Sequence, residues 1–436
     1  MLDIKFIREN KKAIEEAAKN KNVKVDIDQL LKLNGKRREL LIQVDELRAK
    51  RNELAKESKG GKPTLEQINI GKELKEKITT IEKELKTVDA DYQSTLITVP
   101  NLISDDTPIG PDESGNKVIR KYKEPTKFDF ESKDHMQLSE ALGIIDTEKS
   151  ANISGSRFNY LFGEAVMLQF ALLQFVFATL TDKKIIKKLA DKVGNPSDKP
   201  FVPVVPPVMA KSEIMKKMDR FDPIDDRYYL EEDDVLLVGS AEHTLGPLHM
   251  NEIIDEKDLP IRYIGYSTAF RREAGSYGKD TAGILRCHQF DKAEMETFVQ
   301  PEYGQKEQDL IVAIQEYLIR QLELPHQIVA ICSGDMGKPD FRQIDIECWM
   351  PGQNKYRETN TSDYMTDFQA RRLNIRYRKK DGGKEMIHMN DATAFAMGRM
   401  LIAILENYQQ ADGSILIPEV LKKYMPGDIT KIEVKK

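Results

Sequence analysis

Two arginines on either side of a glycine-rich turn could bind phosphate in the middle of this chain. Residues 262–290 predict a strand, a long turn and a second strand, because Ile and Tyr recur before a turn that three glycines interrupt. Arg271 and Arg286 flank this turn, and Glu273 and Phe290 lie close to them. Guanidinium groups fork onto phosphate oxygens, and an aromatic ring can stack on a base. Composition leaves a second interpretation open, in which the hairpin is solvated and its charges pair with one another.

Other familiar chemical signatures are missing from the sequence. There is no GxGxxG after a strand, no GxxxxGK[ST] loop, no HExxH and no GxSxG. The histidines show no metal-ligand spacing beyond His243 and His249, and we expect that pair to be structural. His288, inside the hairpin, has no evident nucleophile partner and is expected to be a positioning residue.

Composition predicts a soluble globular protein of two or three domains. The chain has 436 residues, of which 32% are charged, and its net charge of -5 argues against a uniformly basic nucleic-acid binder. Three widely spaced cysteines support neither a disulfide framework nor a thiolate zinc site, which fits a reducing cytoplasm. Because the N-terminal residues lack a basic region followed by an apolar core, we expect no signal peptide. The apolar run 165–180 is shorter than the roughly 20 residues of a membrane span, so we expect a buried core or interface helix and no membrane.

Two heptad runs lie N-terminal to the elements that must position the hairpin. Leucines recur every seven residues from Leu33 to Leu54, and a second apolar seam runs from Leu74 to Tyr92. A Gly-Pro break at 60–64 separates them, so the sequence predicts an antiparallel coiled-coil hairpin at about 28–95. Arg37 and Arg51 fall on seam positions and weaken the coil locally. The many basic residues of the first run suit either an ordinary solvated coiled coil that dimerises or a probe for a phosphate backbone.

A linker rich in Pro, Gly and Asp follows at 99–111, and the domain boundary is expected there. We therefore divide the chain into residues 1–105, which contain the helical hairpin, and 106–436, a second and larger domain. Beyond the linker, strands and helices fall outside regular βαβ alternation, which predicts an α+β fold with a largely antiparallel sheet.

The hairpin sequence FRREAGSYGKDTAGILRCHQFDKAEM resembles motif 2 of the class II aminoacyl-tRNA synthetases, and in detail that of bacterial-type seryl-tRNA synthetases. The apolar helix and the strand ending at Pro207 are similar to motif 1, and residues 398–409 are similar to motif 3. Residues 368–372 and the N-terminal hairpin match as well, so the resemblance spans essentially the whole chain. It implies a class II antiparallel-sheet catalytic domain preceded by a coiled-coil arm that grips tRNA.

The resemblance also implies the activity of a serine–tRNA ligase. Such an enzyme makes seryl-adenylate from serine and ATP with Mg²⁺, then transfers the seryl group to the 3′ end of tRNA(Ser), and also of tRNA(Sec). The family acts as a homodimer in the cytoplasm. The catalytic residues implied are Arg271, Glu273 and Arg399.

The same resemblance assigns individual binding roles. For ATP it implies Arg271 at the α-phosphate, Glu273 at the adenine amino group, Phe290 stacked on adenine, Arg286 at the outer phosphates and Arg399 near the γ-phosphate, with Glu358 holding Mg²⁺ between phosphates. The serine-binding residues implied are Ser240, Glu242, Arg271, Glu294, Thr361 and Thr393.

The chain departs from the family pattern on the serine side. Ser240-Ala-Glu replaces Thr-Ala-Glu, Thr361 stands where the family has serine, and Asn390-Asp391-Ala392-Thr393 replaces Asn-Gly-Ser. A threonine supplies the same hydroxyl, so serine remains the expected substrate. Two alternatives stay open. A carrier-protein aminoacyl ligase built on the same core lacks the long arm, and a non-catalytic paralogue would have lost Arg271, Glu273 or Arg399.

Overall fold

The computed structural model describes residues 1–57, 64–274 and 283–435, which form two compact units, Met1–Leu102 and Ile103–Lys436. The predicted turn at 60–64 therefore lies outside the described residues apart from Thr64, as does most of the glycine-rich turn of the motif 2 hairpin.

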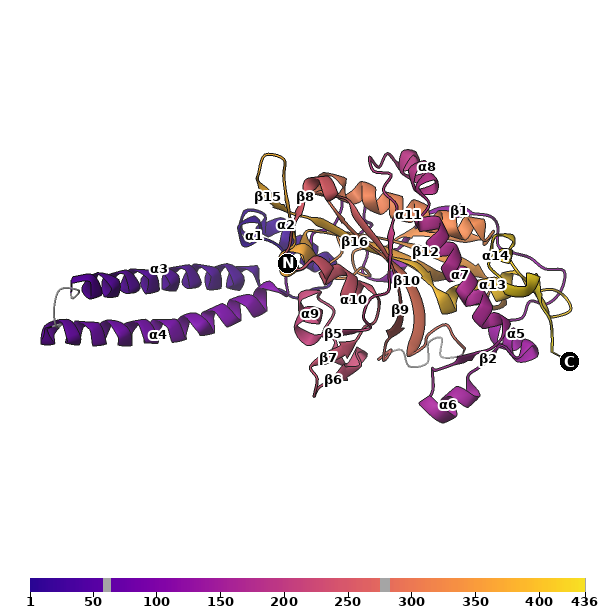
Figure 1. Cartoon of the computed structure of the whole chain (residues 1–436), viewed down its shortest axis with the longest axis horizontal. Helices are drawn as coiled ribbons and strands as arrows, with labels where there is room; N and C mark the ends of the chain where they lie inside the picture. Colours follow the sequence, from indigo (N-terminus) through magenta and orange to yellow (C-terminus); the bar gives the residue numbers. More distant parts are fainter. Residues whose placement is uncertain (58–63, 275–282, 436) are drawn as a thin grey trace. The chain divides into compact units, whose positions relative to one another are not determined.

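The regular elements in the described part of the first unit are all helices. Two short helices, α1 (Ile4–Glu9) and α2 (Lys11–Asn20), precede the long helices α3 (Ile27–Glu57) and α4 (Leu65–Leu96). These two run antiparallel, as Figure 1 shows. The 31 residues of α3 correspond to about 46 Å at 1.5 Å per residue. Thr64 begins α4 with a capping box to Gln67. The predicted coiled-coil hairpin is confirmed.

Heptad positions explain why α3 and α4 pair. Leu40 and Val44 of α3 are buried in the seam, and so are Ile78 and Val88 of α4. Ion pairs border this seam: Lys36 Nζ lies 2.6 Å from Glu84 Oε1, and Arg48 Nη2 lies 2.8 Å from Glu82 Oε1. Arg37, on a seam position, is accommodated because it pairs with Asp89 at 2.5 Å and lies 5.3 Å from the Tyr92 ring centroid.

The second unit is built on an eight-stranded sheet. Its strands lie in the order β1 (Lys117–Tyr122), β11 (His326–Ala330), β12 (Arg342–Met350), β13 (Lys355–Thr366), β16 (His388–Ala396), β10 (Gln289–Val299), β9 (Ile261–Phe270) and β4 (Val202–Val204). Every neighbouring pair is antiparallel except β4 with β9. The predicted α+β class with an antiparallel sheet is confirmed.

Three helices pack against this sheet and build the main core: α7 (Glu164–Leu180), α11 (Gly304–Gln321) and α13 (Met397–Asn407). Leu168, Leu172 and Val176 of α7 are fully buried, as its apolar sequence predicts. Among the described residues no single helix is long and apolar enough to cross a membrane. Taken together with α8 (Lys183–Val193), α7 reaches the length and composition of a span, but the two helices are bent by 68°.

Shorter elements surround the main sheet. The helices are α5 (His135–Leu142), α6 (Glu148–Ser154), α9 (Ser212–Lys217), α10 (Glu242–Leu245), α12 (Phe368–Leu373) and α14 (Glu419–Lys422). The small sheets are formed by β5 (Met209–Lys211), β7 (Val235–Leu237) and β6 (Tyr229–Leu230); by β15 (Lys384–Met386), β14 (Arg376–Arg378) and β8 (Ile253–Asp255); by β2 (Ile145–Asp146) and β3 (Tyr160–Leu161); and by β17 (Ile415–Leu416) and β18 (Lys431–Ile432).

Candidate active site

A pocket over β10, β13 and β16 and the start of α13 brings together most of the predicted site residues. Eight of them line it: Arg271, Glu273, Arg286, Phe290, Glu358, Thr361, Thr393 and Arg399. They come from segments up to about 130 residues apart in the chain, as their numbers show. The antiparallel pairing of β10 with β16 and of β16 with β13 is what places them side by side.

Arg271 is the first residue after β9, and its guanidinium is fixed from two sides. Its Nε donates to the Gly239 carbonyl oxygen at 3.1 Å, and its Cζ lies 5.4 Å from the Phe290 ring centroid. His288 holds the backbone here, because its Nδ1 lies 2.9 Å from the Arg271 carbonyl oxygen. The cation is therefore positioned at the pocket before any ligand arrives, and His288 acts on it through the main chain.

Glu273 and Arg286 face each other across the motif 2 hairpin. Arg286 Nη1 lies 3.4 Å from Glu273 Oε2. Glu273 has a positive φ of 51°, a conformation that non-glycine residues seldom adopt. Arg157, which the sequence did not single out, donates from Nη1 to the Glu273 carbonyl oxygen at 3.3 Å. That bond stabilises the unusual backbone that aims the Glu273 carboxylate.

Glu358 and Arg399 meet at another wall of the pocket. Arg399 Nη1 lies 3.0 Å from Glu358 Oε1 and donates to the Glu358 carbonyl oxygen at 2.9 Å. The Glu358 side chain is 48% exposed, so its carboxylate is open to a ligand in solution. Asp345 lies behind it, where burial and the Glu358 charge hold the pKa of Asp345 well above its ordinary value. Half-exposed carboxylate oxygens are ligands that suit Mg²⁺.

The remaining predicted residues, Ser240, Glu242 and Glu294, lie behind the pocket wall. Their exposed fractions are 1%, 7% and 0%. Lys292, which lines the pocket, links it to this deeper region, because its Nζ lies 2.6 Å from Glu294 Oε2 and 3.2 Å from Ser240 Oγ. These three residues thus form a buried floor, with two carboxylates, beneath the open part.

The two threonines lie between the floor and the opening. Thr393 is the cross-strand partner of Glu294 in the pairing of β10 with β16. Thr361 Oγ1 accepts from Gln343 Nε2 at 3.3 Å. Both threonines line the pocket, and the Thr361 hydroxyl also donates to Asp363 Oδ1 at 3.4 Å.

Charge partners set opposite ionisation behaviour for the two floor glutamates. Burial raises the pKa of Glu294 to about 7, although Lys292 acts against this. Burial also opposes ionisation of Glu242, but Arg220 outweighs it and holds the pKa of Glu242 well below its ordinary value. Arg220 Nε lies 2.6 Å from Glu242 Oε1. Burial lowers the pKa of the adjoining His243 to about 4, so that ring is neutral at pH 7.

Sequence reasoning missed Arg220 and gave Lys292 no role. Arg220 lies between α9 and β6, in a segment that carries no recognisable motif. Lys292 could have been found, because it belongs to the motif 2 sequence and stands two residues before Glu294.

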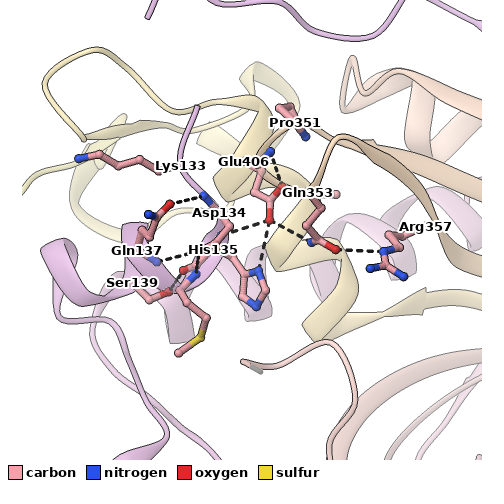
Figure 2. A network of polar contacts seen from close by, with 12 residues as sticks. Lys133, Asp134, His135, Gln137, Ser139, Pro351, Gln353, Arg357 and Glu406 are labelled. Carbon is pink, nitrogen blue, oxygen red and sulfur yellow. Dashed lines mark hydrogen bonds and ion pairs between the residues drawn. The ribbon is translucent and has the colours of Figure 1, made fainter. Parts of the chain in front are cut away.

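A second network of polar contacts joins Glu406, His135, Gln353 and Arg357, as Figure 2 shows. Glu406 of α13 accepts from the backbone N–H of His135 at 3.1 Å, lies 3.2 Å from its ring Nδ1, and accepts from Gln353 Nε2 at 3.1 Å. Gln353 Oε1 in turn accepts from Arg357 Nε at 3.0 Å. Gly283 lies against the other ring nitrogen of His135, since a Cβ at Gly283 would overlap His135 Nε2. The helix that carries Arg399 is thereby tied to the base of motif 2.

Comparison with known proteins agrees with this geometry. Residues 226–408 match the class II tRNA synthetase core domain (G, H, P, S and T), so fold and site define a class II aminoacyl-tRNA synthetase. Residues 1–103 match the seryl-tRNA synthetase N-terminal domain. The chain belongs to the seryl-tRNA synthetase family.

Individual relatives cover the whole chain. A serine–tRNA ligase of Dictyoglomus turgidum is 40% identical, with 100% of both chains covered. One of Nitrosopumilus maritimus is 37% identical, with 98% of this chain and 99% of the relative covered. The crystal structure of seryl-tRNA synthetase from Pyrococcus horikoshii complexed with ATP is 35% identical and superposes with a TM-score of 0.87, with 100% of both chains covered. The family resemblance inferred from the motif 2 sequence is confirmed.

Proposed function

We propose that this protein is a serine–tRNA ligase, which makes seryl-adenylate from ATP and serine and then transfers the seryl group to the 3′ end of tRNA(Ser). The proposal rests on one observation: a pocket lined by cations and an aromatic ring lies next to a buried set of carboxylates. Three arginines and an aromatic ring line the open pocket, and a buried carboxylate floor lies behind it. The arginines and the ring suit a nucleoside triphosphate. The carboxylates suit the ammonium group of a small amino acid.

The open part of the pocket would bind ATP. Phe290 would stack on adenine and Glu273 would accept from its amino group, while Arg286 and Arg399 would contact the outer phosphates. Each of these arginines now contacts an acid, Glu273 or Glu358, and phosphate oxygens would compete for the guanidinium. Glu358 would hold Mg²⁺ between phosphates, and the ion would neutralise the charge that develops on the leaving pyrophosphate.

Arg271 would act at the reacting atoms. A serine carboxylate oxygen attacks the α-phosphorus of ATP, a P–O bond forms, and pyrophosphate leaves with the bonding electrons. The carboxylate is already ionised, so this step needs no general base. A guanidinium held by Gly239 and Phe290 is preorganised to contact both the carboxylate and the α-phosphate, and such fixed charges lower the barrier more than mobile ones.

The floor would recognise the amino acid. Ser240, Glu242 and Glu294 would accept from the α-ammonium or the hydroxyl, with Thr361 and Thr393 near the hydroxyl. Buried polar groups that pair only with a hydroxyl strongly reject a substrate that lacks it. Alanine should therefore be excluded.

The first unit would bind the tRNA. Exposed basic residues of α3, among them Arg38, Lys50 and Arg51, support contact with a phosphate backbone. Recognition by shape and backbone suits a tRNA with a long variable arm and extends to tRNA(Sec) on the same chemistry.

Two exposed apolar side chains of α7, Met167 and Phe170, support a homodimer through this helix. Two such chains would let the arm of one subunit present tRNA to the site of the other.

The decisive assay is ATP–pyrophosphate exchange with each amino acid in turn. Serine should support rapid exchange. Exchange that does not depend on serine would refute the proposed function.

A further inference from the structure

Glu406 is a buried carboxyl group to which the proposed chemistry gives no role. It lies near the C-terminal end of α13, and its exposed fraction is 0%. Among the described residues its one recorded ion-pair partner is His135, at 3.2 Å. Because burying a carboxyl group is unfavourable unless hydrogen bonds satisfy its oxygens, the donors around Glu406 show which segments it holds in place.

The donors come from two segments that are far apart in the chain, as Figure 2 shows for His135 and Gln353. Glu406 Oε1 accepts from the His135 backbone N–H and from Gln353 Nε2, both at 3.1 Å. Glu406 Oε2 accepts from the Gly352 backbone N–H at 2.9 Å. One side chain of α13 therefore holds both the start of α5 and the turn Pro351–Gln353 between β12 and β13.

The start of α5 leads to the phosphate side of the pocket through the motif 2 hairpin. Gly283 lies against the His135 ring, and a Cβ on Gly398, in the first turn of α13, would lie 3.1 Å from the Ile284 carbonyl oxygen. Two consecutive residues of the hairpin thus contact α5 and α13. Arg286 follows two residues later, so these contacts limit where its guanidinium can lie.

The turn leads to Glu358 by a second route. Gln353 Oε1 accepts from Arg357 Nε at 3.0 Å, and Arg357 directly precedes Glu358 on β13. The pairing of β12 with β13 skips Thr359, which makes a bulge beside Glu358. Since a bulge changes the direction of neighbouring side chains, an anchor at Arg357 fixes the direction of the Glu358 carboxylate.

Arg399 belongs to the same helix as Glu406. The two residues are seven positions apart, which is about two helical turns and places them on one face of α13. The contacts of Glu406 therefore also fix the helix face that presents Arg399 to Glu358.

We propose that Glu406 is a positioning residue for nucleotide binding. Through α5 and the turn Pro351–Gln353 it holds Arg286 and Glu358 at fixed separations from Arg399. This inference rests on the proposed function and adds to it a device that sets the geometry of the ATP side.

The amino-acid side is not part of this network. No hydrogen bond or ion pair recorded among the described residues joins Ser240, Glu242 or Glu294 to Glu406. Loss of the Glu406 contacts should therefore weaken the binding of ATP and leave the binding of serine almost unchanged.

The test compares the full chain with Glu406→Gln in serine-dependent pyrophosphate exchange. Glutamine has nearly the same size, but its amide NH₂ cannot accept a hydrogen bond, so the variant must lose at least one of the contacts. The KM for ATP should rise on the order of 10- to 100-fold, since a displacement of about 1 Å can lower activity about 100-fold. The KM for serine should change little.

Glu316→Gln is the matched control. The Glu316 side chain is 5% exposed on α11, pairs with Arg120 and Arg320, and does not line the pocket. This variant should be destabilised and keep the KM for ATP of the wild type. Gln353→Leu removes only the route to Arg357, so it tests the inference even if Glu406→Gln does not fold, and it should also raise the KM for ATP.

A double mutant distinguishes positioning from general structural damage. Part of the effect of Glu406 acts through Arg399, so the rise in the KM for ATP in Glu406→Gln/Arg399→Ala should be smaller than the product of the two single effects. Single effects that multiply in full would contradict the inference.

Other outcomes would overturn it as well. They are an unchanged KM for ATP in both Glu406→Gln and Gln353→Leu, or equal rises in the KM for ATP and for serine. Calorimetric titration with ATP separates this inference from the proposed function. If the wild type shows no exchange but binds ATP, and Glu406→Gln weakens that binding, the function fails and the positioning role stands; if ATP does not bind, both fail.

Discussion

Arg271 is the residue on which the proposed chemistry depends most. Its guanidinium is held by a carbonyl oxygen and an aromatic face, so little reorganisation is needed when charge develops at the α-phosphate. We expect Arg271→Ala to slow serine-dependent exchange by at least about 100-fold, since a preorganised charge of this kind contributes roughly 3–4 kcal/mol to the transition state. Steady-state exchange kinetics measure the effect.

The neighbouring Arg272 offers a matched control. Its Cζ lies 5.0 Å from the Tyr228 ring centroid, and it does not line the pocket. Arg272→Ala should keep most of the exchange activity. Comparable losses in the two variants would mean that net positive charge, and not the position of Arg271, is what matters.

Glu294 makes stability depend on pH in a defined direction. Its pKa is about 7 in the folded chain, against an ordinary value of 4.5, so the folded state holds more protons between these values. The contribution of Glu294 to stability therefore falls as pH rises from about 4.5 to about 7. Glu294→Gln cannot ionise, and its stability relative to the wild type should improve across this window by up to about 3 kcal/mol.

Urea unfolding at pH 5 and pH 8 measures that change. Glu419→Gln, whose side chain is 85% exposed in the wild type, should show no comparable trend. A relative stability of Glu294→Gln that stays constant with pH would contradict the assigned cause.

At the scale of elements, the end of the motif 2 hairpin is braced against α13 through His135. Gly283 has a φ of 71°, and a Cβ there would overlap His135 Nε2 and lie 2.8 Å from Met136 Sδ. Gly283→Ala should therefore slow exchange and destabilise the chain by about 1–3 kcal/mol beyond backbone strain. Exchange kinetics combined with unfolding measurements check this.

Gly194 provides the comparison, because its φ of 69° is nearly the same and a Cβ there meets nothing within 4 Å. Gly194→Ala should lose only the roughly 1–2 kcal/mol of stability that a left-handed backbone costs a non-glycine residue. Its exchange rate should not change. If both alanine variants exchange equally fast, the contact between Gly283 and His135 does not position the hairpin.

Local patterns explain which elements could be predicted. Heptad leucines and a Gly-Pro break identify α3 and α4, and the apolar run identifies α7. Strand order in the main sheet could not be obtained this way, since β10 pairs with β16 about 100 residues later and nothing local records that pairing. Arg220 was missed because its own surroundings carry no motif and one of its partners, Asp391, lies far along the chain on β16.

At the scale of the whole molecule, we expect the first unit to serve tRNA binding and the second unit to serve adenylation. We expect replacement of residues 28–95 by a short Gly-Ser linker to abolish tRNA charging while serine-dependent exchange persists. The residues proposed for adenylation all lie in Ile103–Lys436, which has its own core. Aminoacylation and exchange assays on the same preparation measure the two activities.

A variant that keeps the arm complements the deletion. Arg38, Lys50 and Arg51 are exposed, although Arg51 falls on a heptad seam position. Changing all three to Gln therefore removes charge without altering a buried side chain. Charging should weaken and become less sensitive to salt, while exchange is unchanged. Loss of exchange in either variant would show that the arm also supports adenylation.

The central claim, that the pocket forms seryl-adenylate, is tested most directly by ATP–pyrophosphate exchange with serine and alanine side by side. We predict fast exchange with serine and a rate lower by about four orders of magnitude with alanine, because the floor would leave polar groups unpaired without the hydroxyl. Equal exchange with the two amino acids, or exchange without either, would contradict the account.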